Sequence, residues 1–403
     1  MPQFIAIPVA QGDAFYLERE GFSLLVDGGR SRSALPSMFQ VATKTDGVNV
    51  IVCTHNDADH ANGILGFLEA GLKCEELWLP GRWLGALPDV LRPFSEVFRD
   101  LVDNVNNIAE KDIPSNVETP QQSPSLIEAY GERVHDRLTE DPATAEGPSI
   151  AENGWPESYL QMLEQAEPWD LLPYLPGLWD PENWLLALRL YQQLEPARVQ
   201  LVWSAIDAAD RIRAIAAAAF HRGLPVQWFE FDITTLPDLH LRGGVPELRP
   251  VNGREVASVR PRVGSLLDWL PLTVSNKESL VLWSPATAHH PGVLFTADSD
   301  LAGVGLPSQL DGAIATAPHH GSEANANAYR AVAAASNARS ITWVRSDGRY
   351  RSRPGSTYLG LASRLCTICR RARGNPTMKQ VVRLYSSGGA WIRHRETRVC
   401  SCQ

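Results

Sequence analysis

Short apolar runs that end in turn residues make up the beginning of the chain. They predict strands at residues 4–9, 22–27, 49–53 and 76–79, and a helix from 63 to 71. The run at 49–53 is apolar throughout, which is typical of a strand buried in a sheet. This alternation of strands and a helix predicts a layered α/β fold.

The middle of the chain has a different pattern. Residues 84–204 are rich in Pro, Glu, Leu and Trp; within them, 185–194 has helical spacing and 139–157 has the composition of a loop. We interpret this region as a largely helical insertion. Its tryptophans are expected to form a small core of their own rather than a ligand cage (Trp155, Trp169, Trp179 and Trp184).

The α/β pattern then returns. A helix is predicted at 206–222, followed by a strand at 226–231. Two further apolar runs, 279–283 and 293–297, are expected to pair as neighbouring strands, and 314–317 is a short strand.

The composition is that of an ordinary globular protein: 403 residues, 44% hydrophobic and 21% charged. The length suits one large α/β domain with an insertion, or two domains. No apolar run approaches the ~18 residues of a membrane span, and the first residues lack a basic segment typical of signal peptides. We therefore expect a cytoplasmic protein without a membrane partner, in which the six cysteines are thiols or metal ligands.

The net charge of −9 is unevenly distributed. Residues 331–403 contain 14 Lys and Arg against only Asp347 and Glu396, whereas 131–170 contain ten acidic and two basic residues. Both segments are explained by ordinary solvated surface. Alternatively, the basic segment contacts an anionic substrate or docks on the acidic insertion, which is also a candidate surface for a protein partner.

The strongest chemical signal is the run from residue 51 to residue 60. It is an apolar strand that ends in four side chains able to bind metal: His55, Asp57, Asp59 and His60. Crowded carboxylates repel one another unless a cation lies between them. This run predicts a metal-dependent hydrolase.

Five separated motifs occur in a fixed order along the chain. They are Gln11-Gly12-Asp13, Val26-Asp27-Gly28-Gly29, Thr54-His55-Asn56-Asp57-Ala58-Asp59-His60, Asn276-Lys-Glu-Ser-Leu280 followed by Phe295-Thr-Ala-Asp298, and Pro318-His319-His320-Gly321-Ser322. Together they resemble the metallo-β-lactamase superfamily. Within it, the chain is most similar to the soluble ComEC-like branch, which is related to the nuclease domain of DNA-uptake proteins. The resemblance covers residues 1–80 and 205–365.

The resemblance implies an α/β fold of the four-layered αββα sandwich type, with the site on loops at one edge of two packed sheets. On this basis the chain divides into four parts. They are a first core part (1–83), a helical acidic insertion (84–204), a second core part (205–365) and a basic, Cys-rich C-terminal extension (366–403).

The resemblance also implies a centre of two divalent metal ions, zinc or manganese. His55 and Asp57 are expected to face one metal and Asp59 and His60 the other, because alternate residues of an extended loop point in opposite directions. Further ligands and catalytic residues are implied at other motifs: Asp298 as a carboxylate shared by both metals, His319 or His320 as a late imidazole, Asp27 as an orienting group, and Ser322 as a contact for a substrate anion.

Three departures from the family pattern affect this assignment. Asp57 stands where many members have His, and oxygen ligands shift the preference towards Mn²⁺ or Mg²⁺, with Zn²⁺ still compatible. No mid-chain residue clearly matches the family's remaining histidine, and we interpret the three candidates as surface or core residues (His135, His221 and His240). Arg351-Ser-Arg353-Pro354 stands where relatives often have His-Pro; an arginine there suits a phosphate or is a solvated loop charge.

The cysteines near the C-terminus form a second candidate metal site. Cys366 and Cys369 make a C-x₂-C pair, and Cys400 and Cys402 make a C-x-C pair. Four thiolates are the right number for a closed tetrahedral zinc site, which predicts a structural Zn²⁺ that ties the end of the chain to the fold. The alternative is four free thiols on a frayed tail. Cys53 and Cys74 are expected to be packing residues.

We expect the two-metal centre to hydrolyse a phosphodiester by means of a metal-activated hydroxide, as a nuclease or nucleotide phosphodiesterase. A nucleotide or a single strand fits better than a duplex, because the acidic chain offers few contacts to phosphates. Two alternatives remain. One is hydrolysis of a lactone, ester or amide, since fold does not decide chemistry. The other is a metal-stabilised interaction component of a multi-gene bacterial defence or stress system.

Overall fold

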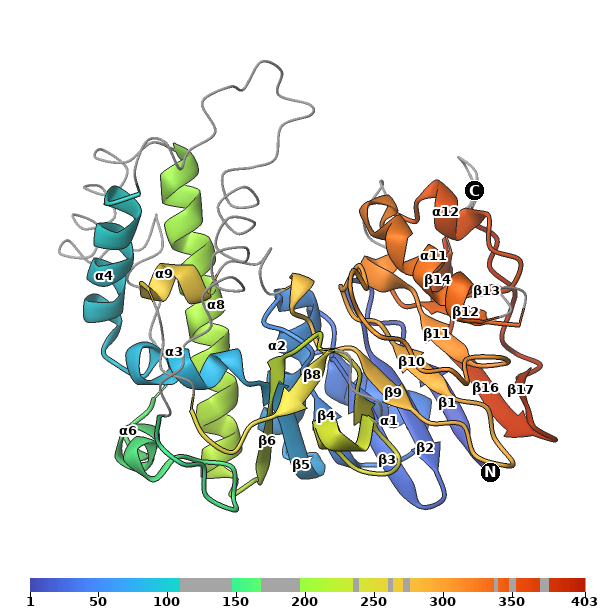
Figure 1. The fold of residues 1–403 in the computed structure, drawn as a ribbon, viewed down its shortest axis with the longest axis horizontal. Helices are drawn as coiled ribbons and strands as arrows, with labels where there is room; N and C mark the ends of the chain where they lie inside the picture. The colour runs from blue at the N-terminus through green and yellow to red at the C-terminus, as the bar shows by residue number, and fades with distance from the viewer. Residues whose placement is uncertain are drawn as a thin grey trace.

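The structure is a computed structural model, and two β-sheets occupy its centre (Figure 1). It describes residues 1–108, 147–167, 196–234, 239–259, 264–270, 276–336, 340–347, 353–369 and 377–402. Within these ranges no helix is long and apolar enough to cross a membrane.

The larger sheet has nine strands in the order β17-β16-β1-β2-β3-β4-β5-β6-β8. Its strands are β1 (Gln3–Ala6), β2 (Phe15–Arg19), β3 (Phe22–Val26), β4 (Gly47–Val52), β5 (Lys73–Pro80), β6 (Val226–Phe231), β8 (Gly253–Glu255), β16 (Val382–Ser387) and β17 (Ala390–Arg393). β3 to β6 run parallel, so that their carboxyl ends meet at one edge of the sheet. β1 pairs with β2 on one side and with β16, from near the end of the chain, on the other.

The second sheet has six strands in the order β13-β12-β11-β10-β9-β7. Its strands are β7 (Arg249–Pro250), β9 (Leu282–Ser284), β10 (Val293–Phe295), β11 (Ile314–Thr316), β12 (Thr342–Arg345) and β13 (Arg364–Cys366), and β14 (Ile368–Cys369) and β15 (Met378–Lys379) form a separate pair. β10 to β13 are parallel, whereas β9 and β10 are antiparallel neighbours, as the sequence predicts.

Apolar side chains from the two sheets form one shared buried cluster. Phe4 and Phe15 of the larger sheet contact Phe295 of the second sheet, with ring centroids 6.2 and 6.3 Å from that of Phe295. The opposite face of the larger sheet packs against α1 (Leu35–Thr43), α2 (Ala58–Glu69) and α8 (Pro196–His221). The opposite face of the second sheet packs against α11 (Ala326–Ala335) and α12 (Ser356–Leu359).

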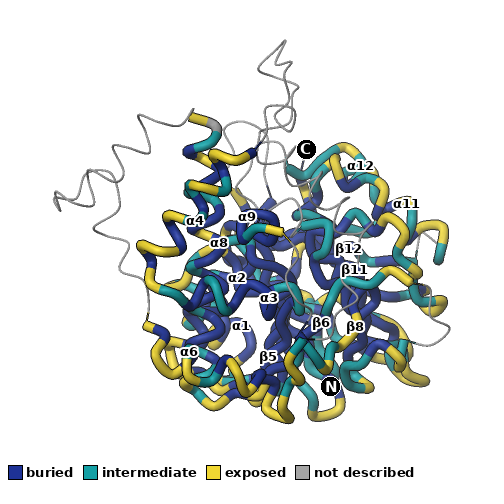
Figure 2. Tube along the Cα trace, turned by 60° about the vertical axis from the view of Figure 1, so that its left-hand side comes forward, coloured by how far each residue is buried: buried dark blue, intermediate teal, exposed yellow. Residues whose placement is uncertain are grey.

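The remaining helices lie beside the larger sheet, on the left in Figure 1. They are α3 (Arg82–Val90), α4 (Phe94–Asn106), α6 (Leu160–Glu164) and α9 (Leu266–Trp269), with the short 3₁₀ turn η2 (Glu157–Tyr159). The turn η4 (Leu239–Arg242) lies instead against β7 and β8. α8 contacts α2, α3, α4 and α6, and it runs continuously across residues 204 and 205. In Figure 2 the central strands are buried, whereas exposed residues lie on the outward sides of α4 and α6; the edge strands β8 and β17 are largely exposed.

The predicted strands are present, and the N-terminal end differs in three elements. α1 (Leu35–Thr43) was not predicted. β2 was not predicted, although Phe15–Arg19 pairs with both of its neighbours. α2 begins at Ala58 rather than residue 63, because the Asp57 carbonyl already accepts hydrogen bonds from the N–H groups of His60 and Ala61.

The expectation of a separate tryptophan core is wrong for Trp155. Its ring packs edge-on against Trp228 of β6 and Phe220 of α8, inside the main core, because the loop carrying it lies against that strand. The other three tryptophans of the insertion, the helical pattern at 185–194 and residues 139–146 of the predicted loop lie outside the described residues.

Candidate metal centre

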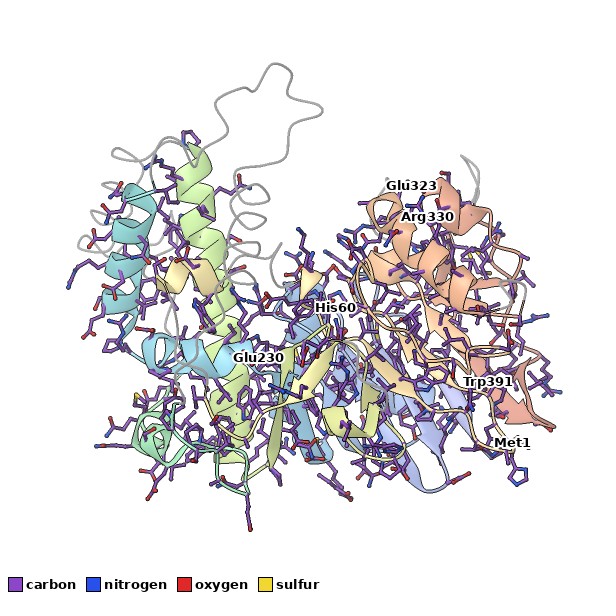
Figure 3. All side chains as sticks on the ribbon, viewed as in Figure 1. Met1, His60, Glu230, Glu323, Arg330 and Trp391 are labelled. Carbon is purple, nitrogen blue, oxygen red and sulfur yellow. The ribbon has the colours of Figure 1, made fainter. Side chains whose placement is uncertain are left out.

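The predicted site residues meet where strands of both sheets end. Asp27 follows β3, His55 follows β4, Asp298 follows β10, and His319 and His320 follow β11. β3 and β4 are parallel, as are β10 and β11, so these residues share the carboxyl edges of the two sheets. Figure 3 places His60 at this junction.

Two groups of side chains here are spaced to hold a metal ion, and they share one carboxylate. His55, Asp57 and Asp298 form the first group; Asp13, His60, Asp298 and His320 form the second. In each group the candidate ligand atoms lie within 4.8 Å of one another. Asp298 thus occupies the shared position that the sequence predicts for it.

Asp27 and Thr54 fix the rings of His60 and His55. Asp27 Oδ2 accepts a hydrogen bond from His60 Nδ1 at 2.7 Å and one from the Thr54 hydroxyl at 2.8 Å. Because that hydroxyl gives its only proton to Asp27, it accepts from His55 Nδ1 at 2.9 Å. Both histidines therefore turn Nε2 towards the centre, which is the ring atom left to bind a metal.

Asp13 holds His320 in the same way, and it is the site residue that the sequence assignment missed. His320 Nδ1 lies 3.1 Å from Asp13 Oδ1, and both side chains are buried. The only sequence signal was the Gln11-Gly12-Asp13 motif. Gly12 is required there, since its φ is +91° and a Cβ would fall 1.6 Å from the Asp59 carbonyl oxygen.

Asp59 and His60 do not lie on an extended loop, so the predicted reason for their direction is wrong. Both belong to the first turn of α2, whose N-cap is Asp57. The helix nonetheless brings Asp59 Oδ2 to 3.4 Å from His320 Nε2, while Asp57 Oδ2 lies 3.9 Å from His55 Nε2. Asp57 therefore lies at the first metal-capable group and Asp59 near the second.

His319 and His320 occupy a strained turn that separates their side chains. Their φ angles are 44° and 55°, in the left-handed region that costs non-glycine residues about 1–3 kcal/mol each. His320 Nε2 lies 3.2 Å from His60 Nε2, whereas His319 Nε2 lies 3.4 Å from Asp298 Oδ2. Among the described residues, only His320 of this pair belongs to a metal-capable group.

His319 is held by two polar neighbours. Its Nδ1 lies 3.1 Å from Asn325 Oδ1, and Arg353 Nη2 lies 2.6 Å from its Nε2. Since a guanidinium only donates, His319 Nε2 is the acceptor and Nδ1 the donor. Arg353 therefore places a positive charge beside the first metal-capable group. Arg351 lies outside the described residues.

Burial and like charge perturb the groups of the centre. Burial, with Asp59 and Asp298 nearby, raises the pKa of Asp57 to about 7. Burial and the neighbouring His60 lower the pKa of His55 to about 3. Burial by itself would also lower the pKa of His60. The carboxylates of Asp298 and Asp27 outweigh this effect and hold the His60 pKa well above the usual range.

These contacts fit a cation between the side chains. His60 and His320 each have a carboxylate at Nδ1, so their two Nε2 atoms, 3.2 Å apart, both point into the centre, where nearby carboxylates raise the pKa of each ring. Asp13 Oδ2, His55 Nε2 and Asp298 Oδ1 are buried without a hydrogen-bond partner among the described residues. Buried acceptors that converge in this way are costly unless a positive charge satisfies them.

The remaining predicted residues lie around this centre or away from it. The Ser322 hydroxyl accepts a hydrogen bond from the Ala324 N–H and caps a short 3₁₀ turn. His221 ends α8 near the Ala166 carbonyl, and His240 lies on η4; neither joins a metal-capable group in the described part of the chain. His135 lies outside the described residues.

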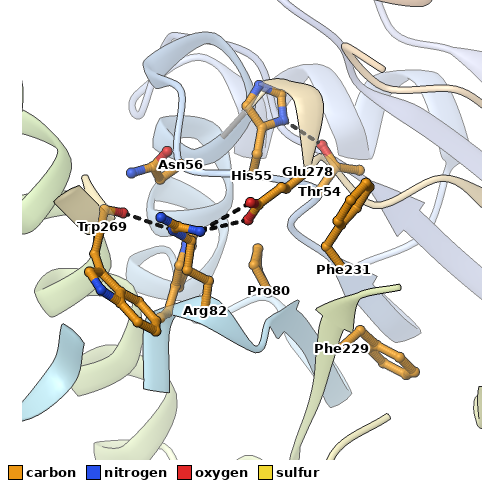
Figure 4. A pocket seen from close by; sticks show the side chains of 10 residues that line it. Thr54, His55, Asn56, Pro80, Arg82, Phe229, Phe231, Trp269 and Glu278 are labelled. Carbon is orange, nitrogen blue, oxygen red and sulfur yellow. Dashed lines mark hydrogen bonds and ion pairs between the residues drawn. The ribbon is translucent and has the colours of Figure 1, made fainter. Parts of the chain in front are cut away.

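A small cavity of about 20 Å³ lies on the outer side of His55, which is room for roughly one water molecule (Figure 4). Arg82 crosses it, with hydrogen bonds of 2.9 and 3.1 Å to Glu278 and one of 3.3 Å to the Trp269 carbonyl. The Arg82 guanidinium also stacks over the Trp269 ring, 4.9 Å from its centroid. Glu278 and Trp269 thus hold the Arg82 side chain across the cavity beside His55.

The four C-terminal cysteines meet in a second, separate cluster. Cys366, Cys369, Cys400 and Cys402 are all buried, and their sulfurs lie within 4.8 Å of one another. They are free thiols that can hold a metal ion, and the frayed-tail alternative does not describe them. Cys53 and Cys74 are buried, as expected of packing residues.

Histidines and carboxylates gathered between two sheets, with a shared aspartate, form an arrangement that can hold metal ions. Residues 7–74 match the family model described as the metallo-beta-lactamase superfamily, which supports this superfamily and indicates a metal-dependent hydrolase. The matched residues include Asp13, Asp27 and the run from His55 to His60; Asp298 and His320 lie beyond them. No curated protein matches the chain significantly.

Proposed function

We propose that the protein is a two-metal phosphodiesterase or nuclease of the ComEC-like type, built on a four-layered αββα sandwich. The proposed substrate is a nucleotide or a single-stranded nucleic acid. The observation that carries the phosphodiester assignment is Arg353, whose guanidinium contacts His319 beside Asp298. Arginine is the side chain best suited to a phosphoryl group, because its planar fork matches the phosphate oxygens.

Each metal would be held by a mixed set of nitrogen and oxygen ligands. His55, Asp57 and Asp298 would hold the first ion. His60, His320 and Asp298 would hold the second, together with Asp59. Carboxylate-rich sets suit Mn²⁺ as well as Zn²⁺. When bound, the ions supply Lewis acidity, which makes water a better nucleophile at neutral pH and stabilises charge on the phosphoryl group.

Neighbouring residues of the chain orient the proposed metal ligands and the substrate. Asp27 and Asp13 hold the rings of His60 and His320 so that Nε2 faces the centre, and Thr54 does so for His55. Arg353 would bind the substrate phosphate and orient it. Ser322 lies at the same turn, where its hydroxyl would contact a second phosphate oxygen.

The charge distribution favours a small or flexible anion. The chain is acidic overall, so contacts to duplex phosphates are few, whereas the basic residues of 331–403 lie in the part that carries Arg353. The acidic insertion would then repel long nucleic acids and is the proposed surface for a protein partner. For the four cysteines we propose a structural Zn²⁺, because four thiolates make a closed tetrahedral set.

A substrate panel tests the assignment. The purified chain, loaded with Mn²⁺ or Zn²⁺, would be assayed on bis(p-nitrophenyl) phosphate, cyclic nucleotides, single-stranded DNA and duplex DNA, with p-nitrophenyl acetate and a lactone for comparison. We expect phosphodiester cleavage, faster on single strands than on duplex. Arg353→Ala should raise KM for phosphodiesters by about 10- to 100-fold if one charge-assisted hydrogen bond of about 1.5–3 kcal/mol is lost.

Arg330→Ala is the matched control, because Arg330 is an exposed residue of α11, directly before the basic segment. It should leave KM unchanged. Cleavage of the acetate or the lactone without any phosphodiester would replace the proposed substrate class. An equal loss in both arginine variants would show that Arg353 acts only through the overall charge.

A further inference from the structure

The geometry of the four-cysteine cluster is that of a metal site. A tetrahedral ion with Zn–S bonds of about 2.3 Å places its sulfurs about 3.8 Å apart. Cys366 Sγ lies 3.8 Å from Cys402 Sγ and 3.1 Å from Cys400 Sγ, in both cases well beyond disulfide length. The Ser401 N–H also points at Cys369 Sγ, at 3.4 Å. Such donors stabilise thiolates and orient them towards a metal.

One buried arginine connects this cluster to the candidate metal centre. Arg345 ends β12, and in the parallel pairing of β12 with β13 it lies beside Cys366. Its side chain is fully buried. Arg345 Nη1 lies 3.4 Å from the Ile368 carbonyl, between the two cysteines of the C-x₂-C pair. Arg345 Nε donates at 2.7 Å to the carbonyl of His320.

The charge of a metal-loaded cysteine cluster accounts for the position of Arg345. Four thiolates around a Zn²⁺ ion carry a net charge of −2, and a buried charge is stable only when it is compensated. Arg345 Nη2 is buried without a hydrogen-bond partner in the described part of the chain, and Asp347 Oδ2 lies 3.9 Å away from it. The guanidinium is therefore a buried positive charge that interacts electrostatically with Cys366 and Cys402 of the cysteine cluster.

The contact of Arg345 with the His320 carbonyl lies in a segment with a strained backbone. His319 and His320 both have left-handed backbones, and such conformations persist only where neighbours determine them. The Gly321 backbone packs on the same side chain, because a Cβ there would lie 3.2 Å from Arg345 Cδ. In Figure 1, β12, β13, β14 and α12 lie together with the C-terminus on this side of the second sheet.

We infer that the four cysteines bind a structural Zn²⁺, and that Arg345 couples this ion to the candidate metal centre by holding the His319–His320 turn. Arg345 is a positioning residue: it contacts neither substrate nor the proposed catalytic metals. The effect on metal affinity at the centre rests on the proposed function. The effect on the backbone of the turn does not.

The test uses the full chain and two arginine variants. Arg345→Lys keeps the charge, but a single ammonium cannot bond both carbonyls. Arg364→Lys is the matched control: Arg364 lies on β13, and its side chain bonds the nearby Leu361 carbonyl, while its contact with the Cys400 N–H is made by the backbone and is kept in the variant. Hydrogen exchange is followed for residues 314–325, with β4 as internal reference, and Mn²⁺ affinity is measured by titration.

We expect one zinc per wild-type chain that resists dialysis against EDTA, with Co²⁺ replacing it to give thiolate charge-transfer bands. Cys402→Ser should lose this ion. Arg345→Lys should retain it but exchange faster at 314–325 and bind Mn²⁺ about 10- to 100-fold more weakly, as loss of an outer orienting group does. Arg364→Lys should match the wild type in all three measurements.

Each half of the inference can fail separately. Absence of tightly held zinc, or two disulfides in its place, overturns the metal assignment. Equal exchange at 314–325 in the two arginine variants overturns the coupling, whether or not Cys402→Ser folds. If the wild type binds no Mn²⁺ but its turn still loosens in Arg345→Lys, the proposed function fails while the coupling stands.

Discussion

The two metal-capable clusters differ in donors, in exposure and in how the chain assembles them. The His–Asp centre collects mixed nitrogen and oxygen ligands from both sheets, and the side chains of Asp57 and Asp59 are each 15% exposed. The cysteine cluster is four identical, buried thiols from the last part of the chain. An accessible, mixed set suits exchange of water and substrate, whereas a closed set suits stability. The His–Asp centre is therefore the better candidate for catalysis, and the cysteine cluster is the better candidate for a structural metal.

Removal of metal by a chelator should give the largest difference between the two clusters. Treatment with EDTA is expected to abolish hydrolysis completely, while the cysteine cluster retains its zinc, because a closed thiolate site releases its ion much more slowly than an open one. Metal analysis by mass spectrometry, before and after dialysis, measures both. Readdition of Mn²⁺ should restore activity. Loss of both metals at equal rates would contradict the contrast.

Asp298→Ala should damage only the His–Asp centre. Because Asp298 belongs to both groups, its loss is expected to lower metal occupancy at both positions and activity by more than about 100-fold, the upper end for a merely orienting group. Asp300→Asn, two residues along the same loop, is the control and should keep both. An Asp298→Ala chain with full occupancy would show that another carboxylate is shared.

Asp27→Asn should have an intermediate effect. The amide cannot accept as a carboxylate does from both His60 and Thr54, so metal affinity should fall by about 10- to 100-fold. Calorimetric titration with Mn²⁺ measures this, and the cysteine-bound zinc should be unaffected. Asp46→Asn, in an exposed pair with Lys73, should change neither cluster. If both variants bind metal equally, Asp27 has no orienting role.

Ser322→Ala should have the smallest effect. Its hydroxyl caps the turn after His320, so its removal should cost about 1 kcal/mol of unfolding free energy in urea, with metal content unchanged. A rise in KM for phosphodiesters alongside this loss would support the proposed substrate contact. Unchanged stability would contradict the capping role.

Sequence reasoning succeeded where the relevant residues are close together in the chain. The run from His55 to His60 and the two cysteine pairs carry their spacing in short segments, so their chemistry is visible before the fold is known. Asp13 was not assigned because its partner, His320, lies about 300 residues away, and only the fold brings them together. A lone buried carboxylate has no local pattern.

The choice between His319 and His320 depends on backbone geometry. Adjacent residues in an extended strand would point in opposite directions, but both residues here are left-handed, a conformation that is uncommon outside glycine and has no local signal in this sequence. β2 was not predicted for a different reason. Its sequence, Phe15-Tyr-Leu-Glu-Arg19, has only three apolar residues before two charged ones, so the apolar pattern is short.

The pairing of β1 with β16 has a consequence for synthesis of the protein. β1 is translated early, but its partner on one side, Val382–Ser387, follows more than 370 residues later. Until then the nascent chain presents an unpaired strand edge, which is a template for unwanted association. We expect emergence of β16, rather than of the N-terminal half, to be the moment at which this edge of the sheet is paired.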